Sequence, residues 1–468
     1  LKRGDAVAVV LESTIDVFPI AWGTQRAGLY LTAISTKVSP EDLVYIVRDC
    51  GASVLIVSDS LALIAMRAVA MEGAPCSFLV HGAREKFSSW AELANAQPRS
   101  PIPDESPGTD MLYSSGTTGR PKGVRPPLPP GPVDGPNSMT GLGQGLYSMG
   151  PETIYLSTAP LYHAAPLRWA MTIHRLGGTA VIMDGFDAEQ ALALIERFRV
   201  THSTWVPTHF VRMLKLPRSV RDAFDLRSHE VAIHAAAPCP KDIKQQMIDW
   251  WGPIIYEYYS GTELAGLTAV TSSEWLERPG TVGRAILGQL RICDDEGEEL
   301  SRGSVGNVYF SDGPPFEYHN DPEKTAAAHN RHGWATLGDI GWVDGEGYLY
   351  LTDRKSFMII SGGVNIYPQE IENCLVSHSK VADAAVFGIP DEEMGERVVA
   401  IVQPFDWREA GPKLAEELLA WARGSMGGVK CPRQIDFRRD LPREPTGKLM
   451  KRHLRNAYLE AARSERSE

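Results

Sequence analysis

Apolar residues are spaced differently along successive stretches of the chain, and the first stretch alternates between two patterns. Short apolar runs typical of buried strands occur at Ala6–Leu11 and Ile154–Ser157. Segments with apolar residues every three or four positions predict helices at Val17–Leu29 and Ala188–Phe198, the second capped by Asp187. Strands that alternate with helices favour an α/β fold with a largely parallel sheet. The same pattern predicts strands at Ser53–Ser58 and Val231–Ala235 and a helix at Lys241–Trp251.

The pattern changes between Thr281 and Tyr350. Short β-prone runs are separated there by turns rich in Gly, Asp and Glu, such as Asp294–Gly297. This spacing indicates a small antiparallel or barrel-like unit. The runs lie at Gln289–Cys293, Asn307–Phe310 and Gly347–Leu351.

A third pattern of apolar residues begins after Arg354 and predicts a separate α+β unit. Between the first α/β elements, residues 125–138 contain six prolines and predict a surface loop. In the last unit we expect helices at Pro368–Ser377 and Pro412–Ser425 and strands at Asp383–Phe387 and Arg397–Gln403.

Composition is that of an ordinary globular protein, with 43% hydrophobic and 22% charged residues among 468. A chain of this length can form two or three domains with a large core. The net charge of −11 and the absence of a dense Lys/Arg block argue against a nucleic-acid partner. Anionic ligands must then be held by local positive sites.

The six cysteines are scattered, which predicts neither a disulfide framework nor a zinc site and suits a reducing compartment. We find no uncharged apolar run of about 18 residues and therefore expect no membrane span. We also recognise no signal peptide. The expected location is the cytoplasm, and the oligomeric state is left open.

The most informative stretch is 113–124, which reads Tyr-Ser-Ser-Gly-Thr-Thr-Gly-Arg-Pro-Lys-Gly-Val. Its glycines allow tight turns and close approach of the backbone to a ligand. Hydroxyl and cationic side chains add donors for phosphate. It is not the common nucleotide-binding loop, because the second Gly of that motif falls on Pro121. The predicted phosphate-contacting residues are Ser114, Ser115, Gly116, Thr117, Thr118, Gly119 and Lys122.

This run resembles the phosphate loop of the adenylate-forming superfamily, which comprises acyl- and aryl-CoA ligases, peptide-synthetase adenylation domains and beetle luciferases. Residues 258–263, Tyr-Tyr-Ser-Gly-Thr-Glu, are similar to its aromatic-Gly-x-Thr-Glu segment, and residues 333–354 to its ribose-binding segment. Residues 359–372 resemble the opening of its small domain, and residues 442–448, Pro-Arg-Glu-Pro-Thr-Gly-Lys, its catalytic-lysine loop. Five motifs in the expected order are far more specific than any one.

The resemblance implies a domain organisation. An N-terminal AMP-binding domain is expected at 1–352, with α/β subdomains and the barrel-like unit. A hinge is expected at 353–356, where Ser356 occupies a position that is usually Asp or Lys in relatives. A small mobile α+β C-terminal domain is expected at 357–468. Relatives usually carry a few dozen residues before an equivalent Gly-Asp-x-Val-Ala, so we expect an N-terminal piece to be missing.

The resemblance also implies ATP and Mg²⁺ as cofactors. Adenylation brings a carboxylate against the α-phosphate of ATP, so the enzyme must neutralise charge and align the attack. Glu263 is the expected Mg²⁺ ligand, since Mg²⁺ prefers hard oxygen ligands. Thr262 is expected to touch the α-phosphate.

Adenosine is expected to bind between two further motifs. Tyr259 would stack on adenine, and Asp339 would accept hydrogen bonds from the ribose hydroxyls. Arg354 would support the same sugar or the phosphate. Relatives usually have Thr where Leu337 stands, which we interpret as a tolerated change. The opposite face of adenine would meet Ala236, Ala237 and Pro238.

Lys448 is the expected catalytic lysine, because an ammonium on a flexible stem can bridge the substrate carboxylate and the α-phosphate. In relatives the small domain then rotates and withdraws this lysine before a thiol attacks the adenylate. Coenzyme A is the expected thiol. Its pantetheine arm would pass close to Ser361, Gly362 and Gly363, where glycines leave room for a thin chain.

The sequence says least about the acid. Residues 160–166 contain no Asp to hold a substrate amino group, which favours an unaminated carboxylate. His163 is expected to border the acyl pocket, with a core histidine as the alternative. We predict an ATP-dependent acyl-CoA ligase for a hydrophobic, fatty-type acid that works through an acyl-adenylate and releases AMP and pyrophosphate. An aryl or phenylpropanoid CoA ligase and a module that loads a separate carrier protein stay open as alternatives.

Overall fold

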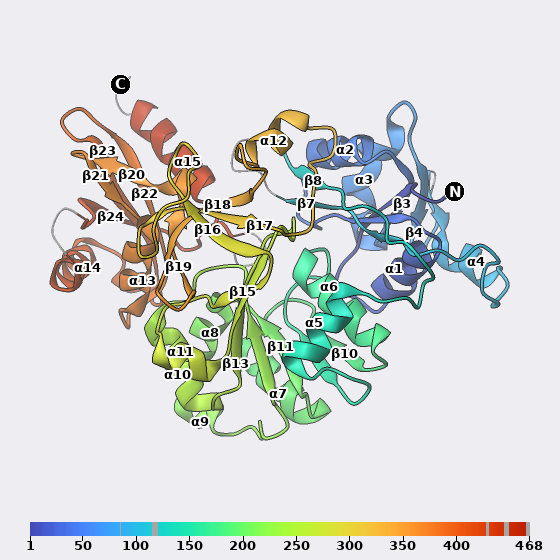
Figure 1. Cartoon of the computed structure of the whole chain (residues 1–468), viewed down its shortest axis with the longest axis horizontal. Coiled ribbons are helices and arrows are strands. Elements are labelled where there is room, and N and C mark those ends of the chain that lie inside the picture. The colour runs from blue at the N-terminus through green and yellow to red at the C-terminus, as the bar shows by residue number, and fades with distance from the viewer. Residues whose placement is uncertain (85, 115–119, 427–429, 444–448, 465–468) are drawn as a thin grey trace.

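The fold combines two α/β layers, a small antiparallel sheet and a terminal α+β unit (Figure 1). The computed structural model describes residues 1–84, 86–114, 120–426, 430–443 and 449–464, the side chains of 461–464 excepted. Within these ranges no helix is long and apolar enough to cross a membrane.

The first sheet is parallel and has the strand order β5-β4-β3-β1-β2-β6. Its buried apolar strands suit a sheet covered by helices. The strands are β1 Ala6–Val10, β2 Tyr30–Ala33, β3 Ala52–Val57, β4 Cys76–Leu79, β5 Ser88–Ser89 and β6 Thr109–Asp110. The helices are α1 Val17–Arg26, α2 Pro40–Asp49, α3 Ala62–Ala70 and α4 Trp90–Asn95.

The second sheet has the order β10-β9-β11-β12-β13-β14-β15, parallel from β10 to β13 and antiparallel beyond. Its strands are β9 Ile154–Ser157, β10 Thr179–Ile182, β11 His202–Trp205, β12 Val231–His234, β13 Ile255–Tyr259, β14 Leu267–Val270 and β15 Arg284–Leu287. Its helices are α5 Ser138–Tyr147, α6 Ala164–Arg175, α7 Ala188–Phe198, α8 Pro207–Leu214, α9 Arg218–Arg221, α10 Lys241–Trp251 and α11 Ser272–Glu277.

Two smaller sheets complete the part of the chain before the terminal unit. The strands β7 Leu112–Ser114 and β8 Lys122–Val124 form an antiparallel pair. The predicted β unit is an antiparallel sheet of four strands in sequential order. Its elements are β16 Gln289–Cys293, β17 Gly306–Ser311, α12 Pro322–Ala327, β18 Ala335–Val343 and β19 Leu349–Arg354.

The terminal unit, orange to red in Figure 1, packs helices against a mixed sheet whose longest pair is β22 and β23. Its strands are β20 Ile359–Ser361, β21 Val364–Ile366, β22 Val381–Asp391, β23 Gly395–Pro404 and β24 Gln434–Phe437. Its helices are α13 Pro368–Ser377, α14 Pro412–Ser425 and α15 Lys451–Ser464.

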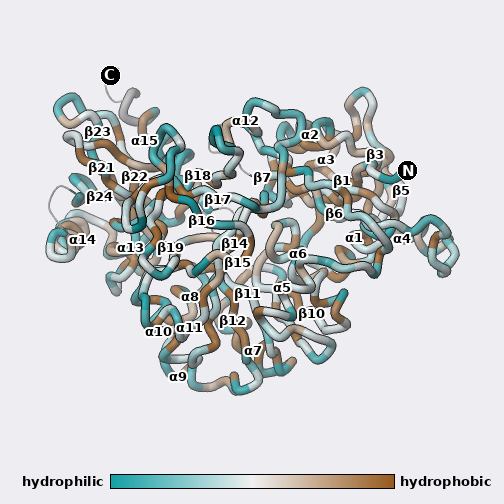
Figure 2. The backbone as a smooth tube through the Cα atoms, in the orientation of Figure 1, coloured by the Kyte–Doolittle hydropathy of each residue, from teal (hydrophilic) through white to brown (hydrophobic). Residues whose placement is uncertain are grey.

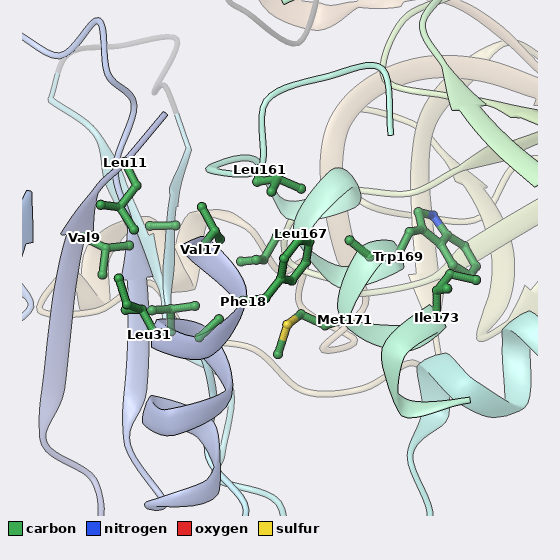
Figure 3. Close-up of a cluster of buried hydrophobic side chains, with 14 of the residues drawn as sticks. Val9, Leu11, Val17, Phe18, Leu31, Leu161, Leu167, Trp169, Met171 and Ile173 are labelled. Atoms are coloured by element: carbon green, nitrogen blue, oxygen red, sulfur yellow. The ribbon is translucent and has the colours of Figure 1, made fainter. Parts of the chain in front are cut away.

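Apolar residues follow the strands and the inner sides of the helices, while many outer loops are hydrophilic (Figure 2). One buried cluster joins the two large layers. It brings Val9 of β1 and Phe18 of α1 together with Leu167 and Trp169 of α6 (Figure 3). The two sheets therefore share a core and form a fixed platform for the site between them.

The predicted helices at 188–198, 241–251, 368–377 and 412–425 are confirmed at their bounds. Asp187 caps α7, since its carboxylate accepts a hydrogen bond from the backbone amide of Gln190 at 2.8 Å. The first helix ends at Arg26 rather than at Leu29. Gly28, at φ 71°, takes the left-handed conformation that commonly terminates a helix.

Candidate active site

A cavity of about 1260 Å³ lies at the carboxyl ends of the parallel strands of the second sheet. The segments that follow β9, β11, β12 and β13 all contribute to its wall. This edge of a parallel sheet is where α/β proteins usually bind ligands. Residues of the third sheet and of the terminal unit also line the cavity, so all the larger parts of the fold meet there.

One wall of the cavity carries the predicted adenosine residues. Tyr259, at the end of β13, donates from its hydroxyl to the Asp339 carboxylate at 2.6 Å. Arg354, opposite Asp339 in the β18–β19 pair, lies 3.3 Å from the other carboxylate oxygen. Burial raises the pKa of Tyr259 and the Asp339 carboxylate adds to the shift, so this hydroxyl stays a donor at neutral pH. The trio holds a carboxylate in a fixed orientation at the cavity surface.

The segment after β12 brings Ala236, Ala237 and Pro238 to the same cavity. Ala236 has φ 75°, a left-handed conformation that costs a residue other than glycine roughly 1–2 kcal/mol. The surrounding structure must therefore hold this backbone in place. Strain of this kind is common where a chain borders a ligand.

A second wall gathers charge around Glu263. The Tyr318 hydroxyl donates to the Glu263 carboxylate at 2.8 Å. The Lys122 ammonium lies 4.8 Å from the centroid of the Tyr318 ring. Burial lowers the pKa of Lys122, and the Glu263 carboxylate partly offsets that shift. Gly261 leaves room for this carboxylate, because a Cβ there would lie 2.5 Å from Glu263 Oε2.

Glu263 is the carboxylate available to a divalent cation here. The described residues include no group of three or more His, Cys, Asp or Glu side chains that could hold a metal on their own. Mg²⁺ usually binds one or two protein carboxylates and completes its shell with phosphate oxygens and water. The Glu263 carboxylate, with the Lys122 ammonium on the same wall, fits that mode of binding.

The predicted phosphate loop is described only at its ends. Ser114 and Lys122 face each other in the β7–β8 pair, and both line the cavity. The residues between them that we predicted to contact phosphate lie outside the described ranges; they are Ser115, Gly116, Thr117, Thr118 and Gly119.

Thr262 also lines the cavity, and its backbone is tied to a buried ion pair. Arg168 on α6 binds Asp110 of β6 at 2.7 Å, and both side chains are largely buried. A further guanidinium N–H of Arg168 donates to the Thr262 carbonyl at 3.3 Å. Removing either charge would leave the other buried and unpaired, so the pair fixes the turn that carries Thr262 and Glu263.

The predicted catalytic Lys448 lies outside the described ranges, but the residues on either side of its loop are placed. Arg443 and Leu449 form an antiparallel bridge, and both line the cavity. These two residues flank residues 444–448 in the chain. Lys451, just beyond, pairs with Glu372 at 2.8 Å. Burial raises the pKa of Glu372 to about 7, although the nearby ammonium acts in the opposite direction.

The predicted pantetheine residues lie elsewhere. Gly362 and Gly363 form the turn between β20 and β21, with φ 56° and 78°, and Ser361 precedes them. None of these three is among the described residues that line the cavity. In this arrangement Arg443 and Leu449 of the terminal unit line the cavity, whereas the β20–β21 hairpin does not.

The predicted acyl-pocket residue His163 is partly buried and lines the cavity immediately before α6. Burial lowers the pKa of its imidazole to about 4, so the ring is neutral at pH 7. Its Nε2 atom is buried without a hydrogen-bond partner. Tyr162, Trp169, Trp205 and Val206 line the cavity with it, which makes this part of the wall largely aromatic and apolar.

Sequence reasoning missed several side chains that organise the site. Tyr318 and the pair formed by Arg168 and Asp110 belong to none of the five motifs. A lone arginine within the apolar stretch of α6 was a usable signal, because buried arginines need a partner. Tyr318 offered no comparable signal, since its contact with Glu263 joins residues far apart in the chain.

Comparison with known proteins gives matches over nearly the whole chain. A family model described as AMP-binding enzyme matches residues 1–314, and one described as AMP-binding enzyme C-terminal domain matches residues 370–448. The chain is 30% identical to the fatty acid–[acyl-carrier-protein] ligase ScoC of Streptomyces coeruleorubidus, over 98% of this chain and 88% of that protein. It is 32% identical to a feruloyl-CoA synthase of an Amycolatopsis species, over 98% and 90%.

A solved structure gives the same picture. The crystal structure of ATP-bound MatB from Rhodopseudomonas palustris is similar with a TM-score of 0.83 and 27% sequence identity. The similarity covers 98% of this chain and 89% of MatB.

Proposed function

The chain belongs to the AMP-binding enzyme family and is an AMP-forming acid–thiol ligase, and we propose that it activates a hydrophobic carboxylic acid as an acyl-adenylate for transfer to coenzyme A. One observation carries this proposal. One cavity is lined by Lys122, Glu263 and the hydrogen-bonded pair Tyr259 and Asp339. The same cavity is lined by Arg443 and Leu449, which flank residues 444–448. ATP binding is also supported by the ATP-bound structural relative.

In the first half-reaction an oxygen of the substrate carboxylate attacks the α-phosphorus of ATP, and the bond to pyrophosphate breaks. The Asp339 carboxylate would accept hydrogen bonds from the ribose hydroxyls, while Tyr259 and Arg354 hold the orientation of that carboxylate. Lys122 and Lys448 would offset the negative charge that builds at the phosphate. Mg²⁺ held by Glu263 would supply further charge neutralisation.

The adenine ring would lie between Tyr259 and the segment from Ala236 to Pro238. Thr262 would meet the α-phosphate from the turn that Arg168 holds in place. The 113–124 loop would enclose the remaining phosphates with backbone amides and hydroxyl groups.

In the second half-reaction the thiolate of coenzyme A attacks the acyl carbonyl, and AMP leaves. The hairpin with Ser361, Gly362 and Gly363 would border the pantetheine arm, which requires the terminal unit to turn. We place the pivot at residues 353–356. Asp353 is buried there and accepts a hydrogen bond from the Gln369 amide of α13 at 2.8 Å, which links the pivot to the terminal unit.

The acid is proposed to be of the fatty type. The apolar wall around His163 and the fatty-acid ligase relative support this class. The feruloyl-CoA synthase relative and the aromatic character of the same wall support an aryl or phenylpropanoid acid as the second candidate. Because the fatty-acid relative is named as acting on an acyl-carrier protein, a carrier-bound thiol is the alternative acceptor.

The order of events gives the first prediction. With acid, ATP and Mg²⁺ but no thiol, we expect a burst of about one equivalent of pyrophosphate per enzyme. Coenzyme A should convert the burst to steady turnover with AMP as the nucleotide product. Quantified pyrophosphate and nucleotide release checks this, and formation of ADP would overturn the proposed chemistry. Turnover with a pantetheine-bearing carrier protein but not with coenzyme A would identify the alternative acceptor.

The second prediction concerns the length of the carbon chain of the acid, and it separates the two classes of acid. Each CH₂ added to a straight-chain acid should strengthen binding by about 0.8 kcal/mol, roughly fourfold, until the pocket is filled. The measurement is the concentration of acid that half-saturates the burst across a series of acids. A flat series combined with tight binding of cinnamate-like acids would favour the aryl candidate instead.

A further inference from the structure

A lysine outside all five motifs reaches from the cavity platform to the terminal unit. Lys215 is the C-cap residue of α8 and directly follows Leu214. Its Nζ donates a hydrogen bond to the Val381 carbonyl of β22 at 2.6 Å. The same ammonium lies 4.0 Å from the centroid of the Phe405 ring, just after β23. Burial lowers the pKa of Lys215 to about 8, and the attraction of Asp383 partly opposes this shift.

The strand that Lys215 contacts also binds Arg443, the last described residue before positions 444–448. Asp383 lies two residues beyond Val381 on β22 and binds Arg443 through two contacts of 2.5 Å. Arg443 in turn forms the bridge with Leu449 that brackets the loop. A bidentate pair of this kind fixes direction as well as distance. A short series of contacts thus joins α8 to Arg443 and Leu449, which flank the predicted lysine loop.

The other end of this series is part of the site. Pro207, Thr208 and Val211 of α8 line the cavity. Lys215 therefore ties a helix of the cavity wall to the strand that binds Arg443. The nearby Lys355–Asp295 pair also bridges the pivot region at 2.6 Å, but both of its side chains are more than half exposed and contribute little.

We propose that Lys215 is a positioning residue that holds the terminal unit in the orientation used for adenylation. The inference rests on the proposed two-step reaction. Lys215 is not among the described residues that line the cavity, and it would act on the 444–448 loop through β22 and Arg443. Its contacts would have to break before the hairpin at Ser361–Gly363 could turn toward the cavity.

The test is Lys215→Met, which keeps an unbranched side chain but removes the charge and the donor. We expect pyrophosphate exchange to slow roughly tenfold, the loss typical of a charged hydrogen bond combined with a cation–π contact. Thioester formation from supplied acyl-adenylate and coenzyme A should be unchanged or faster. Lys215→Arg should retain most of the exchange rate. Lys413→Met, on the exposed face of α14, is the matched control and should change neither step.

A double-mutant cycle with Phe405→Leu separates positioning from general destabilisation. The two replacements should slow exchange less than additively, because they remove the same contact. Equal loss in both half-reactions, additive effects, or an unchanged exchange rate would each overturn the proposal. Failure of the two-step reaction itself would be distinct, since the parent enzyme would then give no pyrophosphate burst.

Discussion

Replacing Lys448 by alanine is expected to slow adenylation by roughly 10²–10³-fold or more, the loss typical of removing a transition-state charge stabiliser. Arg443 and Leu449, which flank residues 444–448, line the same cavity as Glu263 and Asp339. An ammonium from this loop would meet the charge that builds between the acid and the α-phosphate. Coenzyme A attacks a finished adenylate, so thioester formation from supplied acyl-adenylate should survive.

The measurement is pyrophosphate exchange for the first step and thioester yield for the second, with the same enzyme preparation. Lys413→Ala serves as the control, because it removes an exposed lysine on α14 of the same unit. A comparable loss in both steps would assign Lys448 a structural role only. A full exchange rate in Lys448→Ala would remove the lysine from the mechanism.

The order of motifs predicted the architecture well because several motifs contain described residues at the ends of elements that line the cavity. Glu263 and Asp339 are far apart in the chain, yet they lie on walls of one cavity. The resemblance anticipated that arrangement, whereas spacing alone could not. Helix bounds were predictable where a local signal exists, as with Asp187 before α7. The predicted end of the first helix, Leu29, lay beyond the true end at Arg26, because Gly28 terminates the helix.

The contacts that hold the site in place were not predictable from the sequence. Lys215 follows a helix, where a lysine normally interacts with the helix dipole in solvent. Its contacts with Val381 and Phe405 depend on how the terminal unit docks, which no local pattern encodes. The hydrogen bond from Tyr318 to Glu263 likewise joins two elements that only the assembled fold brings together.

The Leu337 departure has a physical explanation in the structure. A Cβ at Gly261 would lie 2.7 Å from a terminal carbon of Leu337, so the leucine side chain packs against the glycine backbone. Asp339, two residues further on, accepts the hydrogen bond from the Tyr259 hydroxyl. The change from a polar to an apolar residue therefore supports the Gly-Thr-Glu turn without altering the charges of the site.

The second large effect is expected from Glu263→Gln, which should slow adenylation by roughly 10²–10³-fold. Gln keeps the shape and can still accept the hydrogen bond from the Tyr318 hydroxyl, so the fold should be retained. It removes the negative charge that Mg²⁺ would bind. The Mg²⁺ concentration for half-maximal exchange should therefore rise as the maximal rate falls.

The same replacement should change the pH dependence through Lys122. Burial lowers the pKa of Lys122 and the Glu263 carboxylate partly restores it, so Glu263→Gln should lower that pKa further. The ammonium would then lose its proton at a lower pH, and exchange should decline earlier as pH rises. Tyr318→Phe, which removes only the hydrogen bond to Glu263, should cost roughly tenfold without that shift. If Glu263→Gln keeps the parent rate and Mg²⁺ requirement, the cation is held elsewhere and Glu263 only orders the turn.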